Sequence, residues 1–269
     1  MSQEIIVDCR DFESGIKTLS CIFNKSEQFL LYILKKINIE SIYEESKSEY
    51  EFHYYICKKY NLIPRDIEKI VWFHFSKTLN PYSYYKNGLL PTDECLELIK
   101  EDCYKLIKDD FSVDEWNMIW YKSIVELPEN DSCKFRTDPP DFGPNGMMIK
   151  DAGLYPGGCT RCFFERPEIV EGILSTIDKN NATNIMDIFS RKAQSCVVTF
   201  IADSDKKIHE VTTAILFYIY NVINGRPFAN MDSCTNYDGK NKAIIPENIL
   251  EVQIITFDNA NASLQTVDR

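Results

Sequence analysis

The segment Cys196–Ala202 constrains the fold most, because it is a nearly unbroken run of apolar, strand-forming residues. Such a run is typical of a β-strand that is buried on both faces, since a half-buried strand alternates apolar and polar side chains. A strand of this kind needs cover on both sides of its sheet. We therefore expect an α/β fold (α+β) in which a small mixed sheet is flanked by helices.

Two further segments are predicted to be strands. Val71–Phe75 is aromatic and β-branched, and Leu250–Phe257 alternates apolar with polar residues. Helices are predicted to outnumber strands. They are expected to begin near Ser26, Thr92, Ser112, Pro167 and Asp205. Ser112 and Glu115 are expected to form a capping box, and the helix from Asp205 is expected to end at Gly225. In the helix after Ser26, the apolar side chains Phe29, Tyr32, Ile33 and Ile37 are expected to share one face.

The 269 residues are expected to form a single domain, because no repeat and no Pro/Ser/Gly-rich linker divides them. Residues 1–65 are predicted to form a helical N-terminal cap on an α/β core of residues 66–269. The acidic stretch 39–52 is expected to be a loop or soft boundary, and the stretch 130–158 is irregular, with prolines and glycines interleaved.

The formal net charge of −11 limits the kinds of binding partner that we expect for this chain. Nucleic-acid binding and docking on anionic membranes are not expected, because both rely on basic surfaces; a protein partner with a basic surface fits better. Met1–Arg10 carries no signal-peptide pattern and no apolar run reaches about 20 residues, so a cytoplasmic protein with no membrane contact is expected. The ten cysteines are then predicted to be mostly free buried thiols.

The segment Phe73–Thr78 carries the most informative chemistry. His74 is expected at the end of a strand with Ser76 two positions later, so both side chains project from the same face. A neutral imidazole can hydrogen-bond a ribose hydroxyl. A short helix follows and closes on Gly88-Leu89-Leu90-Pro91. The alternative is that His74 is a buried histidine hydrogen-bonded to backbone.

These residues resemble the first motif of the ADP-ribosyltransferase superfamily, in which a strand-borne histidine and a following hydroxyl residue bind NAD. The resemblance implies an ADP-ribosyltransferase-like core with NAD as substrate, bound by His74 and Ser76. Gly153-Leu154-Tyr155 resembles the second motif, in which a tyrosine stacks on nicotinamide, and so implies a role for Tyr155. Alternatively, Tyr155 simply covers a loop.

The catalytic glutamate of that superfamily lies on a later strand, which Asn241–Ile249 resembles. In this register Lys242 occupies the glutamate position, where a cation would repel a cationic transition state. Glu247, Glu251 or Asp238 could supply the acid instead. We predict His74 and Glu247 as the catalytic residues.

A broader resemblance links the chain to bacterial proteins of unassigned function, through His74-Phe75-Ser76, Gly88–Pro91, Glu165–Glu171 and Pro246–Ile249. Together the two resemblances imply an intracellular bacterial NAD-binding protein, of a fold often used by toxins and defence effectors. The alternative is a non-enzymatic acidic interaction protein, which the lysine at position 242 favours.

Cys159 and Cys162 form a Cys-x-x-Cys pair. A zinc site would need two more ligands, and Cys133, Cys196 and Cys234 stand at no standard spacing. Two unlinked thiols are the alternative, and we predict no metal site. No phosphate loop, serine-hydrolase elbow or zinc-protease motif is present.

Overall fold

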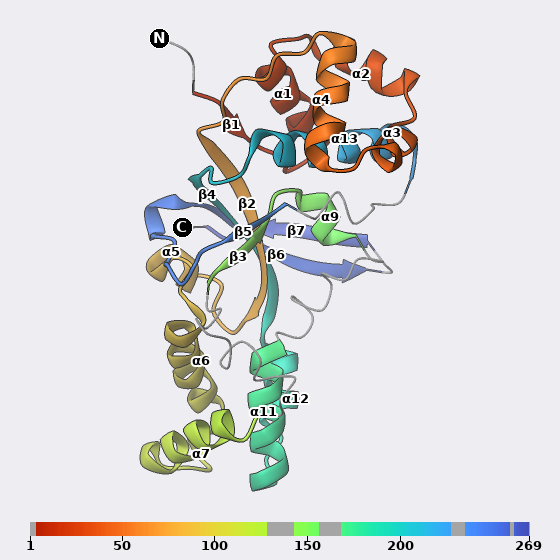
Figure 1. Ribbon diagram of the computed structural model, residues 1–269. Helices are drawn as coiled ribbons and strands as arrows, with labels where there is room; N and C mark the ends of the chain where they lie inside the picture. The colour runs from red at the N-terminus through yellow and green to blue at the C-terminus, as the bar shows by residue number, and fades with distance from the viewer. Residues whose placement is uncertain (1–3, 128–142, 156–167, 227–234, 259–260, 269) are drawn as a thin grey trace. The chain divides into compact units, whose positions relative to one another are not determined.

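The computed structural model describes residues 4–127, 143–155, 168–226, 235–258 and 261–268 (Figure 1). The chain divides into two compact units. The first comprises Met1–Phe73, Gly146–Gly158 and Phe200–Tyr237. The second comprises His74–Asn145, Cys159–Thr199 and Asp238–Arg269.

The first unit is mainly helical and is organised around one buried helix, α13 (Ile208–Ile223). Every residue from Val211 to Asn221 is buried, as expected of a helix that is apolar on all sides. Helices α1, α2 and α4 pack against it (Figure 1). The remaining helical and strand elements that lie wholly in this unit are short. The elements are β1 (Ile6–Val7), α1 (Phe12–Phe23), α2 (Glu27–Lys36), α3 (Ile39–Glu45), α4 (Glu49–Tyr60) and α9 (Lys150–Leu154).

Several sequence predictions for this unit are wrong. The stretch 39–52 is not a loop: it contains α3 and the start of α4, because the side chains of Asn38 and Ser48 cap the two helices. Helix α13 begins at Ile208 rather than at Asp205. Ser26 does cap α2, but Phe29 and Tyr32 are 38% and 62% exposed, and the buried residues are Leu30, Ile33 and Leu34.

The second unit joins a helical cluster to a β-hairpin. Helices α6, α7, α11 and α12 share one apolar core, which includes Trp116, Trp120, Ile173 and Phe189. Ser112 caps α7 in the predicted capping box with Glu115. The elements are α5 (Ser83–Asn87), α6 (Thr92–Ile107), α7 (Val113–Val125), α11 (Glu168–Asn181), α12 (Ile185–Lys192), η2 (Pro246–Asn248), β6 (Ile249–Asp258) and β7 (Asn261–Thr266).

Each of four further strands has residues in both units. They are β2 (Lys69–Thr78), β3 (Asn145–Met147), β4 (Gln194–Asp203) and β5 (Asn236–Asp238). The described strands form one sheet in the order β5-β3-β2-β4-β6-β7, and β1 also pairs with β2. The β1–β2 pairing is parallel (Ile6 opposite Lys69), whereas β2–β3 (Phe73 opposite Met147) and β6–β7 (Ile255 opposite Leu264) are antiparallel.

The three predicted strands are confirmed as parts of β2, β4 and β6. Five consecutive residues of β4, Cys196–Phe200, are buried, as a strand covered on both faces requires. The mixed α/β class is therefore confirmed. No helix within the described part of the chain has the length and apolar character needed to cross a membrane.

Two tryptophans of the helical core allow a matched test of one hydrogen bond. Trp116 and Trp120 are 2% and 0% exposed. Trp116 Nε1 donates to the carbonyl of Lys100 at 3.1 Å, whereas Trp120 Nε1 has no partner among the described residues. Trp116→Phe should therefore lower the free energy of unfolding by about 1 kcal/mol more than Trp120→Phe. Urea denaturation measures both; a Trp120→Phe variant that loses as much would contradict this.

Candidate functional site

The predicted ligands His74 and Ser76 project from the same face of β2, as the alternation of a strand requires. Tyr84 of α5 lies against both. Its ring centroid is 6.5 Å from that of His74, with the planes at 66°. Its phenol hydrogen-bonds with the side chain of Ser76. The structure thus brings His74 and Ser76 together around a tyrosine of the next helix.

The hydrogen bond of His74 decides which ring nitrogen carries the proton. Nδ1 lies 2.7 Å from the carbonyl oxygen of Asn145. A carbonyl only accepts, so Nδ1–H donates, and in the neutral ring Nε2 is the acceptor. The alternative interpretation of His74 predicted a bond of this kind to backbone. That bond also orients the ring and makes Nε2 the hydrogen-bond acceptor of the neutral imidazole.

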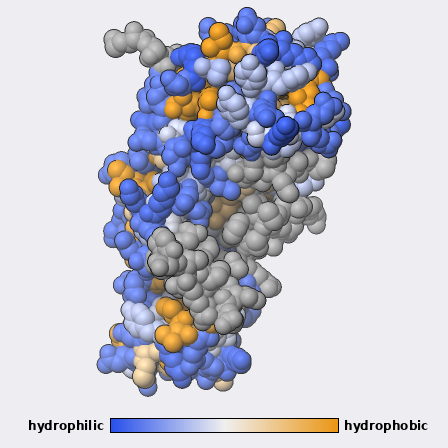
Figure 2. Space-filling model, in the orientation of Figure 1, coloured by the Kyte–Doolittle hydropathy of each residue, from blue (hydrophilic) through white to orange (hydrophobic). Residues whose placement is uncertain are grey.

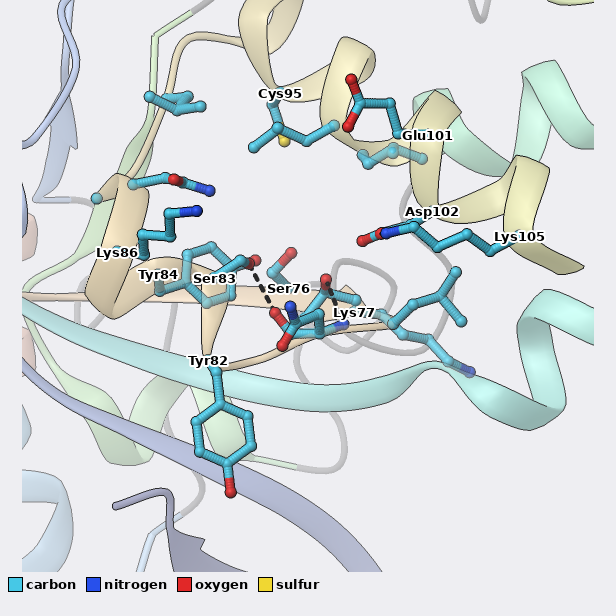
Figure 3. Close-up of a pocket in the computed structure, with 18 of the residues that line it drawn as sticks. Ser76, Lys77, Tyr82, Ser83, Tyr84, Lys86, Cys95, Glu101, Asp102 and Lys105 are labelled. Atoms are coloured by element: carbon cyan, nitrogen blue, oxygen red, sulfur yellow. Dashed lines mark hydrogen bonds and ion pairs between the residues drawn. The ribbon is translucent and has the colours of Figure 1, made fainter. Parts of the chain in front are cut away.

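A pocket of about 440 Å³ opens beside Ser76 and Tyr84 (Figure 3), and His74 is not among the described residues that line it. Its walls come from the end of β2, the loop that follows, α5, one face of α6, and Phe189 of α12. Ser76 and Tyr84 belong to the lining. The volume falls within the range of about 300–1,000 Å³ that is typical of small-molecule sites.

The pocket walls combine apolar, hydroxyl and charged side chains. Figure 3 shows Lys86 on the α5 side, and Glu101, Asp102 and Lys105 on the α6 side. Lys105 Nζ lies 2.6 Å from Asp102 Oδ1. The lining also includes Lys77, Leu79, Ser83, Cys95, Leu98, Ile99 and Phe189.

The thiols around the pocket are not suited to nucleophilic chemistry. Burial raises the pKa of Cys95 to about 11 and that of Cys196 to about 12, so both are neutral at pH 7. Burial also raises the pKa of Tyr84 well above its ordinary value; its phenol hydrogen-bonds with Cys196 as well as Ser76. This end of the pocket therefore offers neutral hydrogen-bonding groups to a ligand.

The closure at Gly88-Leu89-Leu90-Pro91 is confirmed. Helix α5 ends at Asn87, and Gly88, with φ of 73°, donates its N–H to the carbonyl of Tyr84 at 2.9 Å. Leu89 then pairs with Ile244 through two backbone hydrogen bonds of 3.0 and 2.8 Å. The pairing brings two motif segments, Gly88–Pro91 and Asn241–Ile249, side by side.

The three candidate acids lie in the second unit, but none is among the described residues that line the pocket. Glu247 is exposed on η2, which packs against α5. Glu251 accepts a hydrogen bond from Thr266 Oγ1 at 2.8 Å. Asp238 accepts one from the N–H of Lys240 at 2.8 Å and so caps its own turn. Lys242 ends that turn and is exposed, although the resemblance placed it on a strand.

Tyr155 belongs to the first unit, where it follows α9 as a half-buried residue. The pair Cys159 and Cys162 lies outside the described residues, as do Cys133 and Cys234. Within the described residues, no group of three or more His, Cys, Asp or Glu side chains could hold a metal ion.

Sequence reasoning missed the pocket residues of α5 and α6. Tyr84 and Lys86 lie inside the resembling segment but outside its motif. On α6 the signal was available: Cys95, Leu98, Asp102 and Lys105 recur at spacings of three and four, which places them on one face. The neighbouring face, which includes Leu96 and Cys103, is buried in the apolar core of the helical cluster.

Comparison with models of protein families, with curated proteins and with solved structures finds no match for this chain.

Proposed function

We propose that this protein binds NAD, or a related nucleotide, at the pocket beside Ser76, and that its role is ADP-ribosyltransferase-like. One observation carries the proposal. His74 and Ser76 share a strand face around Tyr84, and Ser76 lines a pocket of about 440 Å³. A strand-borne histidine and hydroxyl beside a pocket of nucleotide scale is the arrangement that the motif implies.

The two residues have separate roles in this proposal. His74 Nε2 accepts a hydrogen bond from a ribose hydroxyl, because the bond to Asn145 keeps the proton on Nδ1. Ser76 exchanges its bond with Tyr84 for one with the carboxamide of nicotinamide. These bonds orient the ribose–nicotinamide linkage, which is how binding contributes to bond cleavage.

Catalysis would require a carboxylate near the ribose. Glu247 is our candidate, because η2 packs against α5, whose residues form one wall of the pocket. Its carboxylate would stabilise the positive charge that develops as nicotinamide leaves. We further propose, by analogy of motif alone, an ADP-ribosyltransferase-like core and a role as a bacterial toxin or defence effector.

The test is proton NMR of the protein with NAD. Saturation transfer to NAD is expected for the wild type and should disappear in His74→Ala. The matched control, His209→Ala, removes a histidine of the first unit and should leave the signal unchanged. Free nicotinamide appearing in the same tube, and lost in Glu247→Gln, would demonstrate catalysis. Saturation transfer that survives His74→Ala would refute the proposed site.

A second function is favoured by the exposed position of Glu247 and by the net charge of −11. In this alternative the protein is a non-enzymatic acidic partner of a basic protein, and His74 is structural. Absence of any NAD signal from the wild type would favour this alternative over the first proposal.

A further inference from the structure

Charge is distributed unevenly across the pocket. The side formed by β2 and α5 contributes Lys77 and Lys86 and no acid, whereas the α6 side contributes Glu101, Asp102 and Lys105. Lys105 pairs with Asp102 at 2.6 Å, so the α6 side has a net negative charge. An anionic group in this pocket is therefore favoured on the β2–α5 side.

Lys86 is the cation best placed to receive that group. It lies in the last turn of α5, its side chain is exposed, and Figure 3 shows it extending toward the cavity. Across the described residues, no carboxylate pairs with it. A lysine ammonium is a compact charge with three rotatable donors, which suits a phosphate group.

The opposite wall suits a different chemical group. Leu98 and Ile99 of α6, with Phe189 of α12, give the pocket an apolar lining on that side. A planar, weakly polar base can pack against such side chains, as small-molecule sites commonly combine an apolar wall with a few polar groups. Glu101 and Asp102 border the same side and disfavour a phosphate there.

We propose that the pocket takes a phosphorylated nucleoside in one orientation, with its phosphates at Lys86 and its base against Leu98, Ile99 and Phe189. This inference rests on the proposed function and deepens it, because it names the phosphate contact and the direction in which the ligand lies. The phosphate contribution is electrostatic, so it weakens as salt screens the charge.

The test compares a ligand that carries phosphates with one that does not. ADP-ribose and adenosine are titrated into the full chain by ligand-observed NMR. Lys86→Gln should raise the Kd of ADP-ribose by roughly five- to tenfold and change that of adenosine less than twofold. The matched control Lys179→Gln, on exposed helix surface away from the pocket, should change neither. Raising salt should weaken ADP-ribose binding in the wild type more than in Lys86→Gln.

The outcomes separate this inference from the proposed function. NAD binding that needs His74 but is indifferent to Lys86 would overturn the inference and leave the proposed function standing. ADP-ribose binding that needs Lys86 but does not depend on His74 would overturn the proposed function and leave the inference standing. Equal weakening of ADP-ribose and adenosine by Lys86→Gln would overturn the phosphate contact. Failure of ADP-ribose and inorganic pyrophosphate to bind at millimolar concentration would overturn both.

Discussion

Gly88→Ala is expected to lower the free energy of unfolding by roughly 3–5 kcal/mol. Gly88 has φ of 73° and ψ of −158°, a backbone region that is essentially restricted to glycine and costs a residue with a Cβ about 1–3 kcal/mol. A Cβ at this position would lie 1.9 Å from the carbonyl oxygen of Ile244, and because that atom is backbone the clash cannot be relieved by a rotamer change. The chain must separate there, which breaks the two hydrogen bonds between Leu89 and Ile244, each contributing about 1 kcal/mol.

Gly225→Ala is the matched control for that substitution. Gly225 has a similar φ of 60°, but nothing lies within 4 Å of the position that its Cβ would occupy. Its loss should be limited to the backbone cost of about 1–2 kcal/mol. Denaturation followed by circular dichroism measures both variants. Equal losses would show that the approach of Ile244 is not what requires glycine at position 88.

Local patterns were enough to predict the backbone arrangement around His74 and Ser76. The alternation of a strand was enough to place His74 and Ser76 on one face, and Gly88 was enough to end α5. The pairing of Leu89 with Ile244 was not predictable, because it joins residues far apart in the sequence and depends on backbone contacts alone. The pocket also needs α6 and Phe189 of α12, whose arrival beside β2 is a matter of tertiary packing.

Helix α2 shows how periodicity leaves a choice between adjacent faces. The sequence favoured burial of Phe29 and Tyr32 because they are large and apolar or aromatic. In the structure the predicted Ile33 is buried, but its buried neighbours are Leu30 and Leu34, on the face by which α2 packs against α1 and α13. Lys25 and Lys36 lie over the exposed rings of Phe29 and Tyr32 at 5.9 and 5.8 Å. These cation–π contacts let aromatic rings remain at the surface.

The buried residue His53 in the first unit is held in its neutral form by two hydrogen bonds. Thr212 Oγ1 donates its single proton to the carbonyl of Ile208 at 2.8 Å, so it accepts from His53 Nδ1–H at 2.7 Å. Nε2 is then the acceptor for the thiol of Cys57, at 3.4 Å. Protonation would remove that acceptor and bury a charge. Accordingly, burial, with the nearby His209, lowers the pKa of His53 from 6.5 to about 4.

The low pKa of His53 makes the protein lose stability in acid over a defined range. Above pH 6.5 the residue is neutral in both the folded and the unfolded chain, so it does not make the free energy of unfolding depend on pH. Between pH 6.5 and about 4 only the unfolded chain gains the proton, so the free energy of unfolding falls as pH falls. The loss attributable to His53 should be about 2 kcal/mol.

Urea denaturation across this range, on the wild type and on His53→Gln, measures how steeply the free energy of unfolding of each protein falls with pH. The variant should start less stable at pH 7, because glutamine cannot reproduce both bonds, and then lose less on acidification. Parallel curves would mean that His53 takes up its proton equally well in the folded chain, and that neither Thr212 nor Cys57 holds it neutral.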